Sequence, residues 1–569
     1  MGQISGSENN PPVPQEVLGI NVNCCHNPEC GNFCVPATLT PEDINYLTTP
    51  SGKYTASLGC KECGRYSYIK SNYAIHEELL RLQSLNELST VYRQDGRCCS
   101  KIGCENFGNF KLNDKNSYRK RGTTRAGNQR LQCQLCGLTF TLNSQKRKSH
   151  PQSKSYKNEI LFKLLVNQSP INRAMEMTDL SASAIYKKID MFYERCVSFV
   201  QAREERLKTM DLPSMQLSSD RQEYTVNWTQ RKDKRNVVIS AIGTAEKFSR
   251  YVFGMDVNYD PAVNLNELLE CNEYQNDADL KMFNRRYARI WTLRDYLQEQ
   301  KSKPDPELND KLQKDELSVV DDSKKLPSKG TQVRSEYTMY AHFIRLESLI
   351  GHAKDIRLFV DPEMGIDKAI CNAFKHQIKD GYCKALIVKL NKGLTVDTRR
   401  TMVADTEIML QELVDSGRAF SVNHAKRIVA QDSLKSPEFT NRHPRIWFNV
   451  PIHKINEVGK RVFFINGYEN EDKEELVTWM LQATLHPIDS FFQVVRRRVS
   501  ILERPMQSSS NKGRLWTGKQ PYNPEKINKL LQILRTYYNY CLTGIDGKTP
   551  AEKLGIAKGP VEIRKILYP

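Results

Sequence analysis

The sequence contains no apolar run long enough to cross a bilayer. Its longest apolar stretches, such as ALIVKL and RVFFI, are far shorter than the roughly 20 residues that a membrane-spanning helix needs. The amino terminus, MGQISGSENNPP, has neither the basic start nor the apolar core of a secretory signal, and Gly6 stands where a myristoylation motif requires Ser or Thr. We therefore expect a cytoplasmic protein, associated with the nucleoid and not with membranes.

Hydrophobic residues are not scarce. They make up 39% of the chain, which excludes wholesale disorder. At 569 residues the chain is about twice as long as one hydrophobic core supports, so more than one domain is expected. Because a reducing cytoplasm disfavours disulfides, we expect the 16 cysteines to be metal ligands or core thiols.

Negative charge is in deficit. Lys and Arg number 84 against 66 Asp and Glu, which gives a net charge of +18 and favours a polyanionic partner, most often nucleic acid. Two windows carry most of the excess: residues 111–148 have a net charge of +9 and residues 491–519 one of +6. The predicted DNA contacts within these windows are Arg119, Lys120, Arg121, Arg125, Arg130, Arg496, Arg497, Arg498, Lys512 and Arg514.

Eleven of the 16 cysteines precede residue 137 and form two copies of one pattern. Each copy has a Cys-x4-Cys turn and a Cys-x2-Cys turn, and equivalent cysteines lie 74 or 73 residues apart. Four thiolates at such spacing are typical of a closed, structural Zn²⁺ site. The predicted ligands of two zinc ions are Cys25, Cys30, Cys60, Cys63, Cys99, Cys104, Cys133 and Cys136. Cys24 and Cys98, the first members of two doublets, remain alternatives to their neighbours.

A helix-turn-helix is predicted within residues 155–205. A short helix at about 170–177 is followed by a turn, and Ser181 or Ser183 can cap a second helix. The second helix would present four side chains to a DNA major groove. These predicted contacts are Ser183, Tyr186, Lys187 and Lys188.

From residue 215 onward the pattern changes to strands. Residues 215–228, 236–243 and 249–260 predict three successive strands, and IRLFVDPEMG and KALIVKL predict two more. Asp220 lies in the first strand and Asp361 at the end of the fourth. An unpaired charge in an apolar strand is costly, so both acids are candidates for a function, with Glu223, Asp256 and Glu363 as weaker substitutes.

The third acid belongs to a helix. LHPIDSFFQVVRRRVSILERP predicts one helix that starts at Pro487 and stops before Pro505, with Asp489 in its first turn and Glu503 at its end. Fourteen helical residues would separate the two acids by about 21 Å. Two catalytic metals lie only about 4 Å apart. One site therefore includes only one of these acids.

The order of strand acid, strand acid and helix acid resembles the DDE/DDD insertion-sequence transposases and retroviral integrases, whose catalytic domain has the ribonuclease H-like fold. HPIDSFFQVVRRR is similar to the mariner-type helix signature and to the Glu-Ser-Phe-Phe helix of other insertion-sequence transposases, and both place the third acid at Asp489. VDPEMG resembles the strand of the second acid and matches it to Asp361. YYNYCLTGIDGKTPAEKLGI resembles the ending of bacterial transposases, and the cysteine pairs look like their zinc ribbons.

The resemblance implies a multidomain α/β transposase. We expect a disordered tail at 1–20, zinc ribbons at 21–90 and 91–150, the helix-turn-helix at 155–205, a ribonuclease H-like domain at 212–541 and a tail at 542–569. The interval from Asp361 to Asp489 is longer than in mariner. The extra length suggests an insertion at about 395–480, in addition to one at 262–340, and it keeps Glu503 open as an alternative third acid. A homodimer or larger assembly on double-stranded DNA is implied.

The residue types suit this chemistry independently of the resemblance. Carboxylates are hard ligands for Mg²⁺ or Mn²⁺, and two such ions activate a nucleophile and stabilise the leaving oxygen in phosphodiester cleavage. Asp220, Asp361 and Asp489 are the predicted catalytic ligands. Two other functions stay open: a non-catalytic regulator that binds DNA through the zinc and helix-turn-helix modules, and a nuclease that cleaves branched DNA without joining it.

Overall fold

A computed structural model provides the structure of the protein. It describes residues 13–38, 44–50, 55–94, 104, 106, 115–123, 129–141, 154–227, 232–263, 268, 270, 272–277, 279–296, 325–391, 393–439, 446–469, 471–503 and 517–568. Within these ranges no helix combines the length and the apolar character that a membrane crossing requires.

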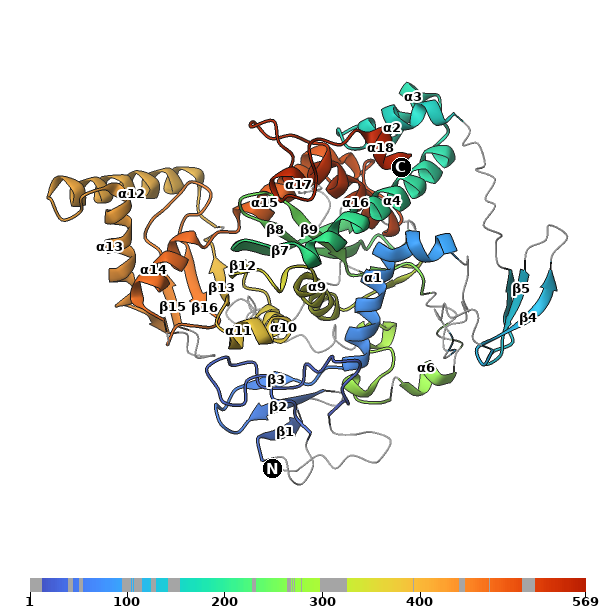
Figure 1. Cartoon of the computed structure of the whole chain (residues 1–569), viewed down its shortest axis with the longest axis horizontal. Helices are drawn as coiled ribbons and strands as arrows, with labels where there is room; N and C mark the ends of the chain where they lie inside the picture. Colours follow the sequence, from blue (N-terminus) through green and yellow to red (C-terminus); the bar gives the residue numbers. More distant parts are fainter. Residues whose placement is uncertain are drawn as a thin grey trace.

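A mixed sheet of eight strands forms the centre of the molecule, in the order β14-β15-β16-β13-β12-β7-β8-β9 (Figure 1). The five strands predicted from the sequence are all present: β7 (Met215–Val226), β8 (Val237–Glu246), β9 (Val252–Val257), β12 (Ile356–Val360) and β13 (Cys383–Lys389). β7, β8 and β9 pair antiparallel, whereas β12 pairs parallel to both β7 and β13. The mixed α/β class expected from the sequence is confirmed.

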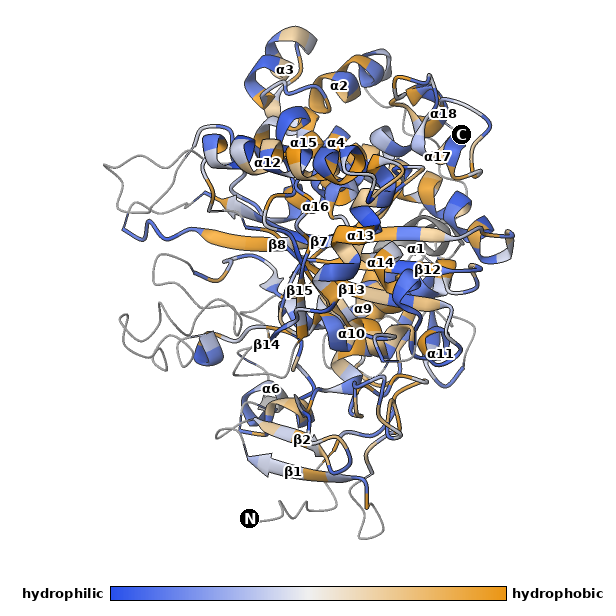
Figure 2. Ribbon diagram, turned by 90° about the vertical axis from the view of Figure 1, so that its left-hand side faces the viewer, coloured by the Kyte–Doolittle hydropathy of each residue, from blue (hydrophilic) through white to orange (hydrophobic). Residues whose placement is uncertain are grey.

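Helices cover both faces of this sheet. α15 (His486–Arg498) packs on β7 and β8, and α16 (Glu525–Tyr540) packs beside it on β9. On the other face lie α9 (Ser335–Ile350), α10 (Ile366–Ala373) and α11 (Lys375–Lys379) (Figure 1). Figure 2 shows that hydrophobic residues gather on the strands and on the helix faces turned toward them. The core therefore lies between the sheet and its helices, as burial of apolar surface requires.

Two segments interrupt the central unit. The segment after β13 contains α12 (Val396–Asp415), α13 (Val422–Leu434) and α14 (Lys473–Gln482), with β14 (Glu438–Phe439), β15 (Ile446–Asn449) and β16 (Arg461–Phe464) extending the sheet. The segment after β9 contains β10 (Tyr259–Asp260), α6 (Asn272–Asp277), a 3-10 turn at Met282–Asn284 and β11 (Thr331–Gln332). Residues 262–300 are helical by their sequence pattern, and the described part of this stretch has α6, the 3-10 turn and a helical turn at 293–296, joined by turns and irregular segments.

Both cysteine-rich modules form three-stranded antiparallel sheets. The first contains β1 (Tyr46–Pro50), β2 (Ala56–Cys60) and β3 (Tyr66–Tyr68), followed by α1 (Asn72–Gln94). The second contains β4 (Tyr118–Thr123), β5 (Gln129–Cys133) and β6 (Thr139–Thr141). Residues 1–20 were expected to form a disordered tail, yet Val13 and Ile20, in its described part, are buried.

The predicted pair of helices is present after a 3-10 turn at Ser155–Lys157 and α2 (Asn158–Leu165). α3 (Ile171–Thr178) ends at Asp179, whose φ of 46° reverses the chain, and Ser181 caps α4 (Ala182–Glu204) by accepting from the Ala184 amide. α17 (Pro550–Lys553) and α18 (Ile563–Leu567) follow α16. Residues 542–569, predicted to form a C-terminal tail, include both helices, and α18 packs against α2 and α4.

A buried ion pair joins α4 to the sheet. Arg535 of α16 is 2% exposed, donates through Nη2 to Glu204 at the end of α4, and donates through Nε to the Val252 carbonyl of β9 (2.9 Å). Tyr251 also donates to Glu204 (2.9 Å). Burial opposes the charge of Arg535, but Glu204 raises its pKa above the usual range. The two charges hold three elements together.

We expect Glu204→Gln to lower the free energy of unfolding by about 3 kcal/mol, because it leaves the buried Arg535 guanidinium without its countercharge. Urea unfolding followed by far-UV circular dichroism measures the change. Glu205→Gln is the matched control, since Glu205 pairs with Lys208 at the surface and its loss should cost well under about 1 kcal/mol. Equal destabilisation by the two substitutions would contradict the assignment.

Candidate functional site

The first cysteine set gathers four sulfurs at one point. Cys25 and Cys63 Sγ lie 3.5 Å apart, Cys30 and Cys60 Sγ lie 3.7 Å apart, and all four lie within 4.8 Å of one another. Cys24 is not in the set; its Sγ lies 4.0 Å from His26 Nε2. Cys25 is therefore the member of the doublet that belongs here, and the donor set fits one Zn²⁺ held by four thiolates.

The second set repeats this geometry. Cys104 and Cys133 Sγ lie 3.7 Å apart, and Cys136 completes a group within 4.8 Å. Cys98 and Cys99, one of which is the predicted fourth ligand, lie outside the described residues. Three converging thiols at the predicted positions can hold a metal, as the duplication of the pattern predicts.

Hydrogen bonds to sulfur favour the thiolate form at one cysteine of each set, whereas burial raises the pKa of Cys25 and Cys30. Burial raises the pKa of Cys60, but the amides of Cys63 and Glu62 and the side chain of Asn32 lower it to about 7. At Cys133, the amides of Cys136 and Leu135 and the side chain of Asn106 overcome burial and lower the pKa to about 6. Thiolates are the metal-binding form of cysteine.

The two asparagines that bond to these sulfurs were missed in the sequence. Asn32 Nδ2 lies 3.6 Å from Cys60 Sγ, and Asn106 Nδ2 lies 3.5 Å from Cys133 Sγ. Both stand two residues after the second cysteine, in CGNF and CENF. The repeat of that asparagine at the same offset as the cysteines was the available signal.

The two modules differ in their attachment to the rest of the protein. The first is docked on the central unit: Cys34 Sγ lies 3.5 Å from the Cys371 carbonyl of α10, and Asn372 donates to the Asn21 carbonyl (2.9 Å). The Gly467 amide also donates to Glu29 (3.0 Å). Figure 1 shows β4 and β5 of the second module standing apart from the central unit.

We expect Cys60→Ser and Cys133→Ser each to reduce bound zinc by one equivalent, as measured by elemental mass spectrometry of purified protein. Cys60→Ser should also lower the main thermal transition, by several degrees, and Cys133→Ser should not, because among the described residues it is the first module that is docked on the core.

Cys541→Ser is the control, because this half-buried thiol belongs to neither set. It should leave the zinc content unchanged. A lower main transition in Cys133→Ser, or unchanged zinc in either ligand variant, would contradict the assignment.

Asp220 and Asp361 occupy neighbouring positions on parallel strands. In the register of β7 and β12, Ser219 pairs with Val360, and the Asp361 amide donates to the Ser219 carbonyl (3.3 Å). Asp361, the residue after Val360, therefore lies opposite Asp220, the residue after Ser219. Asp220 is 8% exposed and Asp361 is half-buried, so both residues are only partly accessible to solvent.

The first turn of α15 lies over the same part of the sheet. The Ile488 amide donates to Ser218 Oγ (3.1 Å), and a Cβ at Gly243 would lie 3.0 Å from Ile488 Cδ1. Gly243 is the partner of Asp220 in the pairing of β7 with β8. Asp489 directly follows Ile488, so its backbone lies in the helical turn at the level of the sheet where Asp220 lies.

The three aspartates do not form a closed cluster. Among the described residues, only the two cysteine sets bring three ligand atoms within 4.8 Å of one another. Like charges repel one another at short range, so an open arrangement around a shared region is the physical expectation for three carboxylates.

Glu503 is separated from this region. The predicted continuous helix through 503 is wrong, because α15 ends at Arg498 and Val499 is extended (φ −116°, ψ 104°). A 3-10 turn at Ser500–Leu502 follows, and Glu503 forms an ion pair with Lys519 (2.7 Å). Glu503 lines a pocket with Glu223 and Thr225, farther along β7 than Asp220.

Two of the weaker candidate acids, Asp256 and Glu363, form ion pairs with basic side chains. Asp256 is buried on β9, accepts from His342 Nδ1 (2.7 Å) and pairs with Arg345 (3.6 Å). Glu363 pairs with Arg221 (2.8 Å). Burial raises the pKa of Glu363, and nearby Asp361 adds to this effect, although Arg221 opposes it.

The basic residues of α15 point in different directions. In the orientation that satisfies both groups, the Gln222 amide oxygen accepts from Arg496 Nε (2.6 Å) and Nη2 (2.8 Å). Arg497 is exposed, and Arg498 donates to Asn167 (2.7 Å). Lys512 and Arg514 lie outside the described residues.

The other predicted DNA contacts are mostly at the surface. The exposed ones are Arg119, Lys120, Arg121, Arg130, Ser183, Tyr186 and Lys187, while Arg125 lies outside the described residues. Lys188 does not point outward as predicted. It is 8% exposed, and its ammonium donates to Asn158 Oδ1 of α2 (2.6 Å).

No protein-family model and no curated protein matches this chain.

Proposed function

We propose that the protein is a DNA transposase of the DDE/DDD class with a ribonuclease H-like catalytic unit. The observation that carries the proposal is the position of three predicted acids in one region of the sheet: Asp220 on β7, Asp361 opposite it after β12, and Asp489 in the first turn of α15, which packs on β7. The strand order β9-β8-β7-β12-β13, with its antiparallel and parallel pairings, supports the ribonuclease H-like assignment.

The three carboxylates fit Mg²⁺ or Mn²⁺ because hard oxygen donors suit both ions. Bound there, the ions would activate water or a 3′-hydroxyl and stabilise the leaving oxygen. The chain itself fixes the positions of the ligands. Backbone pairing fixes Asp361 beside Asp220, and Ser218 holds the start of α15 so that Asp489 stays at the sheet. Asp489 is therefore preferred over Glu503.

By this proposal, DNA is bound by surfaces outside the region of the three aspartates. The exposed cations of β4 and β5 are suited to phosphate contact, and the exposed Ser183, Tyr186 and Lys187 lie at the start of α4, where a recognition helix contacts bases. By this proposal the protein acts in the cytoplasm on paired DNA ends, as a homodimer or larger assembly.

We expect Asp220→Asn, Asp361→Asn and Asp489→Asn each to reduce the rate of strand cleavage and joining at least about 100-fold, which corresponds to about 2.7 kcal/mol. Each change removes a charged oxygen ligand and conserves side-chain volume. The assay uses DNA that carries the ends of the element flanking the gene, with Mg²⁺ or Mn²⁺.

Glu475→Gln, a change on the exposed surface of α14, is the matched control and should retain activity. Glu503→Gln tests the alternative third acid. Full activity in all three aspartate variants would refute the proposal, whereas an active Asp489→Asn with an inactive Glu503→Gln would refute only the third ligand. DNA binding without nicking would favour the regulator. Cleavage of branched DNA without joining would favour the nuclease.

We expect Lys120→Gln to weaken DNA binding uniformly across sequences and to reduce the slope of log affinity against log salt by about 1, because one phosphate contact is lost. Fluorescence anisotropy at several salt concentrations measures the slope. Lys435→Gln, which changes an exposed lysine at the end of α13, should leave the slope unchanged. Equal slopes for Lys120→Gln and the unmodified protein would show that β4 is not part of the DNA-binding surface.

A further inference from the structure

The turn between β8 and β9 brings two cations, Lys247 and Arg250, to the start of α15. Gln216 accepts from Lys247 Nζ (2.8 Å) and donates to Gln482 (3.2 Å), which ends α14 just before α15. Glu246 Oε2 accepts from the amides of residues 248 and 249 (2.9 and 2.6 Å). The turn therefore has a fixed shape and a fixed position beside the helix.

A third cation, Lys454, comes from the loop between β15 and β16. This loop lies against the segment that leads into α15, because Lys460 donates to the Ala483 carbonyl (2.9 Å) and Thr484 donates to Glu457. Lys454 itself is exposed. Two segments that are distant in the sequence thus present cations beside the same helix end.

His486, the first residue of α15, lies near both segments. Burial lowers the pKa of His486, and the positive charges of Arg250 and Lys454 lower it further, although Glu457 opposes them. The two cations therefore act on one place in the molecule. Their mutual repulsion has to be offset, and a bound anion would offset it.

The backbone of Arg250 is strained. Its φ is 63°, in the left-handed region that favours glycine. The side chain is half-buried, and its Nη1 has no hydrogen-bond partner among the described residues. A strained residue whose charge is not paired by the described part of the chain points to a ligand, and a guanidinium suits phosphate.

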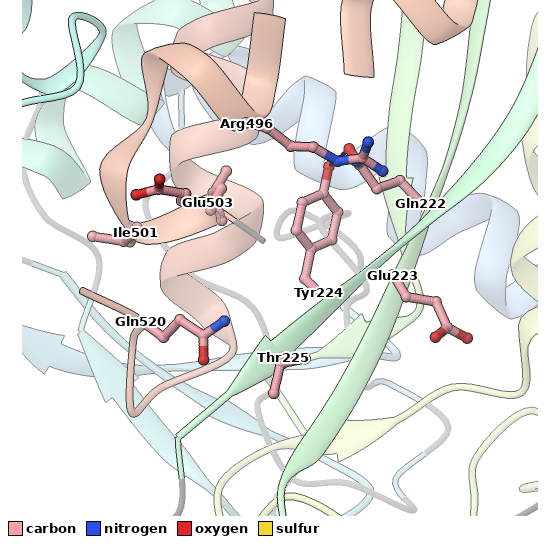
Figure 3. A pocket seen from close by; sticks show the side chains of 9 residues that line it. Gln222, Glu223, Tyr224, Thr225, Arg496, Ile501, Glu503 and Gln520 are labelled. Carbon is pink, nitrogen blue, oxygen red and sulfur yellow. Dashed lines mark hydrogen bonds between the residues drawn. The ribbon is translucent and has the colours of Figure 1, made fainter. Parts of the chain in front are cut away.

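Two carboxylates lie in the same region, and both are buried. Glu246 is 4% exposed and caps the turn, and Glu457 is 6% exposed and pairs with Lys460 (3.7 Å). The other end of α15 differs, because Glu223 and Glu503 line a small pocket there (Figure 3). Carboxylates at that end would repel a phosphate, so the start of α15 is the end that favours an anion.

Apolar side chains accompany the cations. Phe248 is 64% exposed, and Lys247 Nζ lies 5.5 Å from the centre of its ring. Ile455, which follows Lys454, is 46% exposed. In DNA complexes, cations bind phosphates while apolar side chains pack against sugars and bases. A partner that offered only negative charge would leave these side chains in water, so the surface favours nucleic acid.

We propose that the start of α15 carries a further DNA-binding surface, which holds the duplex beside the bond that is cut. The surface consists of Lys247, Phe248, Arg250, Lys454 and Ile455. Leu217 of β7 pairs with Glu246, and Asp220 lies three residues farther along β7, or about 10 Å. That distance corresponds to about three base pairs. The inference rests on the proposed function, because that function places the cut strand at Asp220.

The first test measures binding without cleavage. The full chain carrying Asp220→Asn is titrated by fluorescence anisotropy, at several salt concentrations, with a duplex that contains the cut site. Arg250→Gly and Lys454→Gln should each reduce the slope of log affinity against log salt by about 1, because each loses one phosphate contact. Phe248→Ala should weaken binding about ten-fold and leave the slope unchanged, because an apolar contact releases no counterions.

Lys435→Gln and Phe439→Ala are the matched controls, since both residues are exposed at α13 and β14, and neither change should alter binding. Arg250→Gly should not lower the main thermal transition, because glycine adopts a positive φ without strain. If it does lower that transition, Lys454→Gln decides. Unchanged slopes in the two cation variants, or equal affinities of Phe248→Ala and Phe439→Ala, would overturn the proposal.

Crosslinking tests the position of the surface. Benzoylphenylalanine in place of Phe248 should crosslink to nucleotides about three base pairs from the cut, as mapped by primer extension, whereas the same group in place of Phe439 should give no crosslink. Crosslinks found only farther from the cut than one helical turn, about 10 base pairs, would overturn the placement beside the cut bond.

A last comparison separates this surface from the proposed function. A chain that cuts no DNA but shows the slope changes would refute the transposase function and leave the surface as a DNA contact. A chain that cuts and joins DNA with unchanged slopes would refute the surface alone. Inorganic polyphosphate has no bases, so its binding should not respond to Phe248→Ala, and an equal loss with that polymer would overturn the assignment to DNA.

Discussion

The alternation of side chains along β7 is the constraint on which the arrangement of the molecule depends. Ser218, Asp220 and Gln222 face α15, whereas Ser219 faces α9. Successive residues of a strand point to opposite faces, so a shift of one residue would exchange all of them. A single register thus sets the contact of α15 with Ser218, the face on which Asp220 lies and the contact of Gln222 with Arg496.

That register is held from the opposite face by a buried chain of hydrogen bonds. Asp256 accepts from His342 Nδ1 (2.7 Å), His342 Nε2 contacts Thr244 Oγ1 (2.7 Å), and Thr244 contacts Ser219 Oγ (2.6 Å). Burial opposes the charge of Asp256, but Arg345 and His342 hold its pKa well below the usual range. A fully bonded buried chain tolerates little displacement. This series of hydrogen bonds therefore holds β7 in register with β8 and against α9.

Much of this could be predicted from the sequence because it depends on local patterns. Strand periodicity predicted all five central strands, and cysteine spacing predicted the sets now seen at Cys25 and Cys104. The burial of the Lys188 side chain could not be predicted from the sequence, because it depends on a contact with Asn158 of another helix. The end of α15 at Arg498 was also missed, since the following residues, VSILE, carry no helix-breaking signal before Pro505. Contacts between distant segments decided both outcomes.

The duplicated modules show how one pattern can acquire two roles. Both copies keep the cysteines and the asparagine that bonds to sulfur, so the metal site itself is under the same constraint in each. The first copy has Cys34 where the second has Gly108, and Cys34 is one of the groups that contact α10. The first copy is thus fixed to the central unit, whereas the second copy keeps exposed cations on β4. Under the proposed function these cations contact DNA phosphates.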